Sequence, residues 1–178
     1  MSQTYVIGTS THEAPKLSRG LYITATPIGH LGDVSLRALA TMAAADVLLC
    51  EDTRTTAKLL ERYAIRTKLM PYHEHNAERV RPAIIKALSE GAAYALVSDA
   101  GMPLVSDPGY RLVADCVENN IAITSVPGAS AVLAALALSG LPTAMTGTGA
   151  SPRRVATCPS CATPSLARAA SRGRNQTG

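Results

Sequence analysis

The sequence places a carboxylate and several turn-forming residues directly after a short apolar run. Residues 95–97 are predicted to form a buried strand, and residues 98–109 a loop that Pro103 and Pro108 stiffen. Asp99 then lies at the carboxyl end of that strand. In open α/β sheets ligands bind at this edge, because strand ends and loop backbones leave polar groups facing a crevice. We therefore expect Asp99 to belong to a binding site.

Two further loops carry polar groups that suit the same edge. A glycine loop, Gly-His-Leu-Gly-Asp at 29–33, follows an apolar run, and Glu51 and Asp52 follow the next one. The loop lacks the full Gly-x-Gly-x-x-Gly spacing, so both a phosphate or dinucleotide site and an ordinary strand-to-helix turn stay open. The acids resemble the one that binds a ribose in Rossmann folds, which favours the first alternative without deciding it.

His73 and His75 flank Glu74 and form the third candidate group. In an extended segment alternate side chains share one face, so the two imidazoles could bind a metal or move a proton. A metal site needs further ligands, and we predict none here. The alternative is that both histidines are ordinary loop residues.

Apolar runs and helical patterns alternate along the chain. Asp33 and Asn76 are placed to cap two of the helices. The alternation predicts an α/β domain with a mainly parallel five-stranded sheet, flanking helices and right-handed crossovers. The expected strands are 21–26, 47–50, 68–70, 95–97 and 121–126, and the expected helices are 34–45, 55–63, 77–90, 110–118 and 131–139.

Composition limits the classes of protein that fit. The chain has 178 residues, of which 47% are hydrophobic, enough for one domain with an aliphatic core. With 3% aromatic residues, stacking platforms for single-stranded nucleic acid are scarce. Residues 1–150 have a net charge of −1 and residues 151–178 hold five arginines and no acid, so the net charge of +4 comes from the tail, residues 144–178. We predict that this basic, low-complexity tail is disordered and that residues 1–20 are a mobile leader.

Neither a signal peptide nor a membrane span is evident in the sequence. The first twenty residues carry charges and no apolar core, and the longest apolar run, 131–138, is too short to cross a bilayer. The four cysteines then suit a reducing compartment. We expect a cytoplasmic protein.

Five motifs in order give a specific resemblance. Together they closely resemble the ribosomal RNA small subunit methyltransferase I family, which are 16S rRNA cytidine 2′-O-methyltransferases of the tetrapyrrole-methylase superfamily. The resemblance covers residues 21–143. Its motifs are Leu-Tyr-Ile-x-Ala-Thr-Pro-Ile-Gly-x-Leu-Gly-Asp at 21–33, Cys-Glu-Asp-Thr-Arg at 50–54, Tyr-His-Glu-His-Asn at 72–76, Val-Ser-Asp-Ala-Gly-x-Pro-Leu-x-Ser-Asp-Pro-Gly-Tyr-Arg-Leu-Val at 97–113 and Pro-Gly-x-Ser-Ala at 127–131.

This resemblance implies an S-adenosylmethionine-dependent methyl transfer to the ribose of a decoding-site cytidine in the small ribosomal subunit. It also allows a homodimer. For the hydroxyl proton, the candidate catalytic residues are Glu51, His73 and His75, whose alternative role is to hold the loops by hydrogen bonds. The resemblance implies cofactor contacts at Pro27, Gly29, Leu31, Ser98, Asp99, Gly101, Met102, Ser130 and Ala131.

The chain departs from the family pattern after residue 143. There the family continues into a second domain that forms the other wall of the cofactor cleft, whereas this sequence continues into the arginine-rich tail. We expect a chain truncated after its first domain, inactive or weak in cofactor binding. Two other functions stay open: a tetrapyrrole methylase, against which the motifs at 72–76 and 98–101 argue, and a noncatalytic fragment that binds RNA through its tail.

Overall fold

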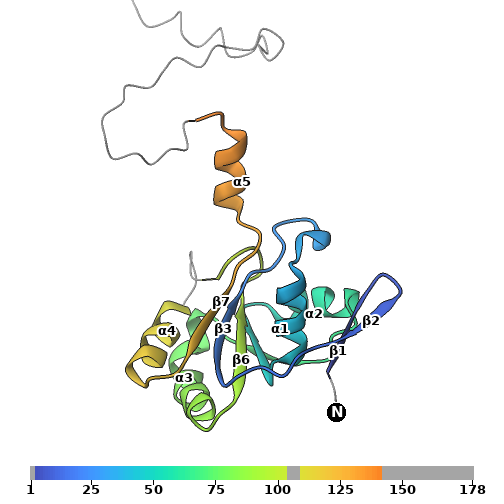
Figure 1. The fold of residues 1–178 in the computed structure, drawn as a ribbon. Helices are drawn as coiled ribbons and strands as arrows, with labels where there is room; N and C mark the ends of the chain where they lie inside the picture. The colour runs from blue at the N-terminus through green and yellow to red at the C-terminus, as the bar shows by residue number, and fades with distance from the viewer. Residues whose placement is uncertain (1–2, 104–108, 142–178) are drawn as a thin grey trace, which may run out of the picture. The chain divides into compact units, whose positions relative to one another are not determined.

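A single parallel sheet forms the centre of the computed structural model, which describes residues 3–103 and 109–141 (Figure 1). The strand order is β5-β4-β6-β3-β7, and all neighbouring strands run parallel. This confirms the predicted five-stranded α/β sheet. The strands are β3 (Gly20–Thr24), β4 (Val47–Cys50), β5 (Lys68–Pro71), β6 (Ala93–Val97) and β7 (Ile123–Val126).

Two pairs of helices cover the two faces of the sheet (Figure 1). Because side chains alternate along a strand, Leu48 of β4 joins one buried cluster while Val47 and Leu49 join the other. Strands buried on both faces explain the uninterrupted apolar runs of the sequence. Helices α1 (Leu36–Ala44) and α2 (Thr53–Arg62) pack on one face, and α3 (Glu74–Ser89) and α4 (Gly109–Glu118) on the other.

The path of the chain creates a crevice above the middle of the sheet. From β3 the chain passes through α1 and α2 to the edge strand β5, and it then returns through α3 to insert β6 between β4 and β3. The helix that follows β6 therefore lies on the opposite face from those that follow β3 and β4. Loops diverge where adjacent strands send their helices to opposite faces, and this leaves room for a ligand at their carboxyl ends.

Two predicted helix caps, Asp33 and Asn76, are wrong. Asp33 ends a short 3₁₀ turn, Leu31–Asp33, and α1 begins later, where Ser35 Oγ accepts a hydrogen bond from Ala38 N at 3.1 Å. Asn76 lies inside the first turn of α3, and its Oδ1 accepts from His73 N at 2.9 Å. The predicted caps were wrong because Ser35 lies at the true start of α1 and Asn76 reaches back to the start of α3 from within it.

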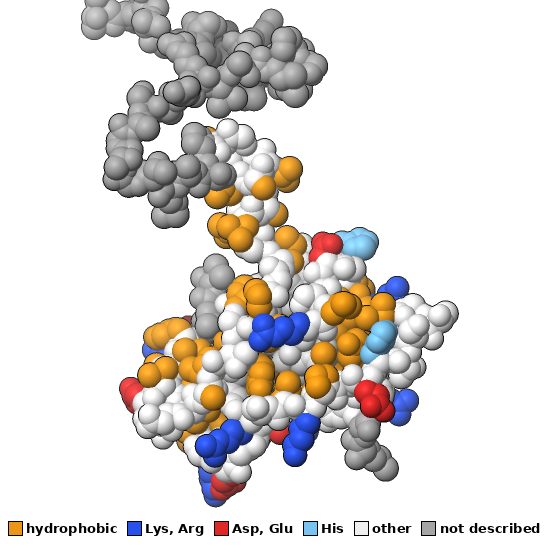
Figure 2. Space-filling view, viewed as in Figure 1, with side chains coloured by type: hydrophobic (Ala, Val, Ile, Leu, Met, Phe, Trp, Pro, Cys, Tyr) orange, Lys and Arg blue, Asp and Glu red, His pale blue; other side chains and the backbone are white. Residues whose placement is uncertain are grey.

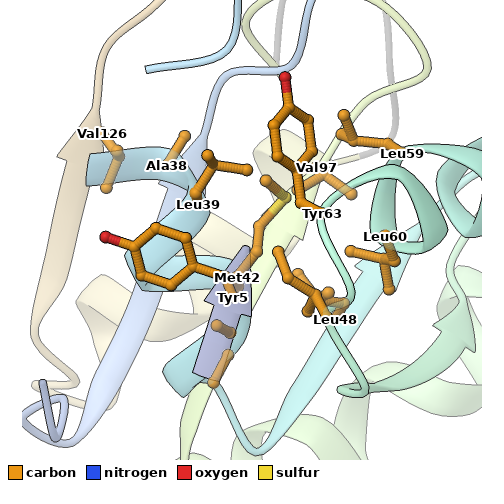
Figure 3. Packing of buried hydrophobic residues seen from close by; sticks show 14 of the residues in the cluster. Tyr5, Ala38, Leu39, Met42, Leu48, Leu59, Leu60, Tyr63, Val97 and Val126 are labelled. Atoms are coloured by element: carbon orange, nitrogen blue, oxygen red, sulfur yellow. The ribbon is translucent and has the colours of Figure 1, made fainter. Parts of the chain in front are cut away.

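The N-terminal residues form a hairpin where the sequence predicted a mobile leader. Strands β1 (Thr4–Ile7) and β2 (Ser10–Glu13) pair antiparallel, turning at Gly8, whose φ is +61°. Tyr5 is 9% exposed and joins the cluster under α1 and α2 (Figure 3). The prediction of an unstructured leader is therefore corrected for residues 4–13. Its apolar pattern is too short to reveal a strand, since β2 is exposed throughout.

The chain divides into two units, Met1–Leu138 and Ser139–Gly178, and the strands and helices named here lie in the first. Its last helix, α5 (Ala131–Leu138), has no buried residue, and Figure 2 shows apolar side chains on its surface. None of the helices within the described ranges is long and apolar enough to span a membrane. The predicted boundary at residue 143 and the tail 144–178 lie outside the described residues.

Replacing Tyr5 tests whether the hairpin is part of the folded core. Tyr5→Ala should lower the free energy of unfolding by about 3 kcal/mol, because a buried ring is lost. His12→Ala is the matched control: His12 stacks on Tyr5 with ring centroids 5.3 Å apart but is exposed, so its loss should stay below about 1 kcal/mol. Urea unfolding measures both. Equal, small losses would mean that the hairpin contributes little to the core.

The two buried cysteines should resist alkylation in the native chain. Burial, with Asp115 nearby as a smaller cause, raises the pKa of Cys116 to about 11, and burial also raises the pKa of Cys50. Because the thiolate is the reacting form, iodoacetamide at pH 8 should label both only after unfolding. Mass spectrometry of the two peptides with and without urea gives the rates. Similar rates in the two conditions would contradict this packing.

Candidate functional site

The loops after β3 and β6 are joined by a short stretch of backbone pairing. Thr26 N donates to Gly101 O at 2.9 Å, and Gly101 N donates to Thr26 O at 3.1 Å. Thr26 Oγ1 also donates to Ser98 O at 2.9 Å. Thr26 is 4% exposed, so these bonds are sheltered from water. This isolated antiparallel bridge therefore joins the two loops beyond the ends of their strands.

Gly101 lies where three loops approach one another. Its φ is +82°, a conformation that residues other than glycine rarely adopt. A Cβ at this position would lie 3.1 Å from Ile28 Cγ2 and 3.4 Å from Ala129 O. The loop after β7, which contains Ala129, thus reaches the same point as the other two. Glycine is required here for both conformation and space.

The loop after β4 joins the site through two acids. Asp52 N donates to Asp99 Oδ1 at 3.3 Å, which links the ends of β4 and β6. The carboxylate of Asp52 caps α2 by accepting from Arg54 N at 2.8 Å, and it pairs with the Arg54 guanidinium at 3.1 Å. These hydrogen bonds lower the pKa of Asp52. Asp99 itself is exposed, so its carboxylate faces solvent at the edge where the sequence placed it.

A pocket of about 300 Å³ opens between these loops. Ser98 and Asp99 form its polar side, and Ile28, Leu31 and Leu59 give it an apolar wall. This size is at the lower end of small-molecule sites, whose walls are commonly apolar with a few polar groups. The lining residues are Thr26, Pro27, Ile28, Gly29, Leu31, Thr55, Thr56, Leu59, Ser98, Asp99 and Ala100.

The predicted cofactor contacts divide into two groups. Pro27, Gly29, Leu31, Ser98 and Asp99 line the pocket, and Gly101 is bonded to its wall. The other three lie outside the lining. Met102 packs against the cluster under α3 and α4, Ser130 Oγ accepts from Leu133 N at 3.4 Å at the start of α5, and Ala131 is exposed.

The proposed base residues gather at the neighbouring strand ends but do not line the pocket. Glu51 is exposed after β4, and Tyr72 N donates to Cys50 O at 2.8 Å, which holds the end of β5 beside it. The rings of His73 and His75 lie 5.9 Å apart, edge to face. They meet at the start of α3, so the extended geometry predicted for them was wrong. Throughout 3–103 and 109–141, no group of three or more His, Cys, Asp or Glu could hold a metal.

Sequence reasoning missed the contribution of α2 to the site. Thr55, Thr56 and Leu59 line the pocket from its first turns. Tyr63 lies at the C-terminal end of α2, and the Tyr63 hydroxyl donates to Leu31 O at 2.8 Å. The signal for the threonines was available, because a helix capped by Asp52 must begin at the end of β4. No pattern in the sequence pairs Tyr63 with Leu31.

Sequence comparison gives relatives with a named activity. The chain is 53% identical over 137 residues to ribosomal RNA small subunit methyltransferase I of Mesorhizobium japonicum, covering 77% of this chain and 47% of that protein. It is 54% identical over 123 residues to the protein of the same name from Halalkalibacterium halodurans, covering 69% and 43%. These matches confirm the resemblance carried by the motifs. The chain spans less than half the length of these relatives.

Structural comparison supports the same fold. A conserved hypothetical protein from Aeropyrum pernix K1 superposes with a TM-score of 0.59 at 22% identity, covering 71% of this chain and 45% of that one. Uroporphyrin-III-C-methyltransferase from Thermus thermophilus gives 0.52 at 23% identity, covering 68% and 52%. Residues 20–172 match the family model of the tetrapyrrole (corrin/porphyrin) methylases. With its parallel sheet and its loops gathered at the strand ends, the chain belongs to the tetrapyrrole methylase family.

Proposed function

We propose that the protein transfers a methyl group from S-adenosylmethionine to the ribose 2′-hydroxyl of a decoding-site cytidine in 16S rRNA. The observation that carries this is the pocket, because its walls are built from the loops whose motifs resemble the rRNA methyltransferases. The whole activity is a proposal, because this chain spans only 47% of the length of such a relative. Residues 21–143 are the proposed methylase domain.

The residues of the pocket fit the proposed cofactor. When bound, S-adenosylmethionine supplies an electrophilic methyl group on a positively charged sulfur. Asp99 offers an exposed carboxylate that accepts hydrogen bonds from the amino or hydroxyl groups of such a ligand. Ile28, Leu31 and Leu59 offer an apolar wall that suits the face of a purine. Gly101 lets the loop after β6 pack closely against Ile28, which lines this wall.

The substrate ribose would lie at the neighbouring strand ends. Glu51, His73 or His75 would accept the proton of the 2′-hydroxyl as the methyl group arrives. His73 is half-buried, and Asn76 fixes its backbone, so its ring is better oriented than the exposed His75. The partner would be the small ribosomal subunit, in the cytoplasm. A homodimer stays a prediction, which sedimentation of the purified chain would test.

Methyl transfer to defined substrates tests the function directly. The chain, extended after residue 143 by the second domain of a family member, is incubated with labelled S-adenosylmethionine and either small ribosomal subunits that lack the modification or a porphyrinogen. Label should enter 16S rRNA, and digestion to nucleosides should recover 2′-O-methylcytidine. Label in the porphyrinogen would support the tetrapyrrole alternative. RNA binding without transfer would support a noncatalytic fragment.

Replacing the base candidates tests their role. We expect His73→Gln to lower kcat by about 100-fold or more at an unchanged KM for the cofactor, as for the loss of a general base. Glu51→Gln and His75→Gln should have smaller effects, and the exposed His12→Gln is the control. Steady-state kinetics across pH gives both constants. Equal losses in kcat and cofactor affinity for His73→Gln would assign it to loop structure instead.

A further inference from the structure

We infer that Tyr63 is a positioning residue for cofactor binding. It acts by holding the carbonyl of Leu31, whose side chain lines the pocket. The identity of the ligand rests on the function proposed above. Tyr63 lies at the C-terminal end of α2 and outside every motif used to recognise the family. Its hydroxyl donates to Leu31 O at 2.8 Å, across 32 residues of sequence.

The ring of Tyr63 is anchored in the core. It is 9% exposed and belongs to the cluster that contains Leu39 and Leu59. Figure 3 shows its hydroxyl oxygen directed away from the other labelled side chains. A tyrosine with a buried ring normally has a partner for its hydroxyl. Here that partner is the backbone of the pocket loop rather than a core residue.

The backbone of Tyr63 is fixed as well. Tyr63 N donates to Leu60 O at 3.2 Å, and Tyr63 O accepts from Val6 N at 2.8 Å, which ties it to β1. The N-terminal hairpin thus braces the residue that holds the loop. Because both its ring and its backbone are restrained, Tyr63 holds the Leu31 carbonyl in a fixed position.

Leu31 has a restrained carbonyl and an available side chain. Its side chain is 42% exposed and lines the pocket. The other hydrogen bonds of this loop are local: Gly32 N donates to His30 Nδ1 at 3.1 Å, and Asp33 N donates to His30 O at 3.0 Å. In the described part of the chain, the Tyr63 bond is therefore the hydrogen bond that joins residues 29–33 to another element.

Removing this hydrogen bond should lower the affinity for the ligand, because it frees the loop that carries Leu31. A loop held in its binding conformation loses less entropy on association, so freeing it costs affinity. A single neutral hydrogen bond of this kind corresponds to a change of about threefold to tenfold in the dissociation constant. The substitution Tyr63→Phe removes only the hydroxyl and keeps the ring in the core.

Tyr22→Phe provides a closely matched control. The Tyr22 hydroxyl also donates to a backbone carbonyl, that of Ser18, at 2.9 Å. Ser18 precedes β3, and neither residue lines the pocket. Equilibrium dialysis of the chain with labelled S-adenosylmethionine should show affinity three- to tenfold weaker for Tyr63→Phe and unchanged for Tyr22→Phe. Affinity of Tyr63→Phe equal to wild type, or equal losses in both variants, would overturn the inference.

Two further measurements separate positioning from general stability. If Tyr63 acts through Leu31, the effects of Tyr63→Phe and Leu31→Ala on affinity should be less than additive in the double variant; full additivity would contradict the inference. Without cofactor, amide hydrogen exchange over residues 28–34 should be faster in Tyr63→Phe than in wild type, and unchanged in Tyr22→Phe. Unchanged exchange over these residues in Tyr63→Phe would also contradict the inference. Absence of binding by wild type would concern the cofactor site and not the role of Tyr63, because the exchange comparison needs no cofactor and still decides whether Tyr63 holds the loop.

Discussion

The backbone pairing of Thr26 with Gly101 is the constraint on which the site depends. It is an antiparallel bridge beyond the ends of β3 and β6, with N to O distances of 2.9 and 3.1 Å. Without it, the two loops would leave the sheet in opposite directions, because their helices pack on opposite faces. The pocket opens beside this pairing. Its shape therefore follows from sheet topology before any ligand-contacting side chain is considered.

The remaining loops are added by the same kind of bond. Asp52 N meets the carboxylate of Asp99, and the hydroxyl of Tyr63 meets Leu31 O. Each link joins backbone on one side, so it fixes where a loop runs and leaves exposed side chains to vary. The apolar core supplies the rigid support, since Leu59 and Tyr63 belong to it and also reach the site.

Much of the fold was accessible from the sequence because local patterns encode it. Five apolar runs gave five strands, and Asp99 at a strand end gave the edge where the pocket lies. The strand order was not accessible, since no local signal says that β6 inserts between β4 and β3. The hairpin was missed because it has few apolar residues, and two helix starts were missed because Asp33 and Asn76 are also good capping residues. The bond of Tyr63 to Leu31 joins segments that only the tertiary fold brings together.

The most direct test of this account is to locate the cofactor on the folded chain. Amide chemical shifts of ¹⁵N-labelled protein, titrated with S-adenosylmethionine, detect weak as well as tight binding and report positions. The account predicts shifts concentrated in residues 26–31 and 98–101, which form the pocket walls. Shifts concentrated instead at the opposite edge of the sheet, around Arg19 and residues 119–122, would contradict it.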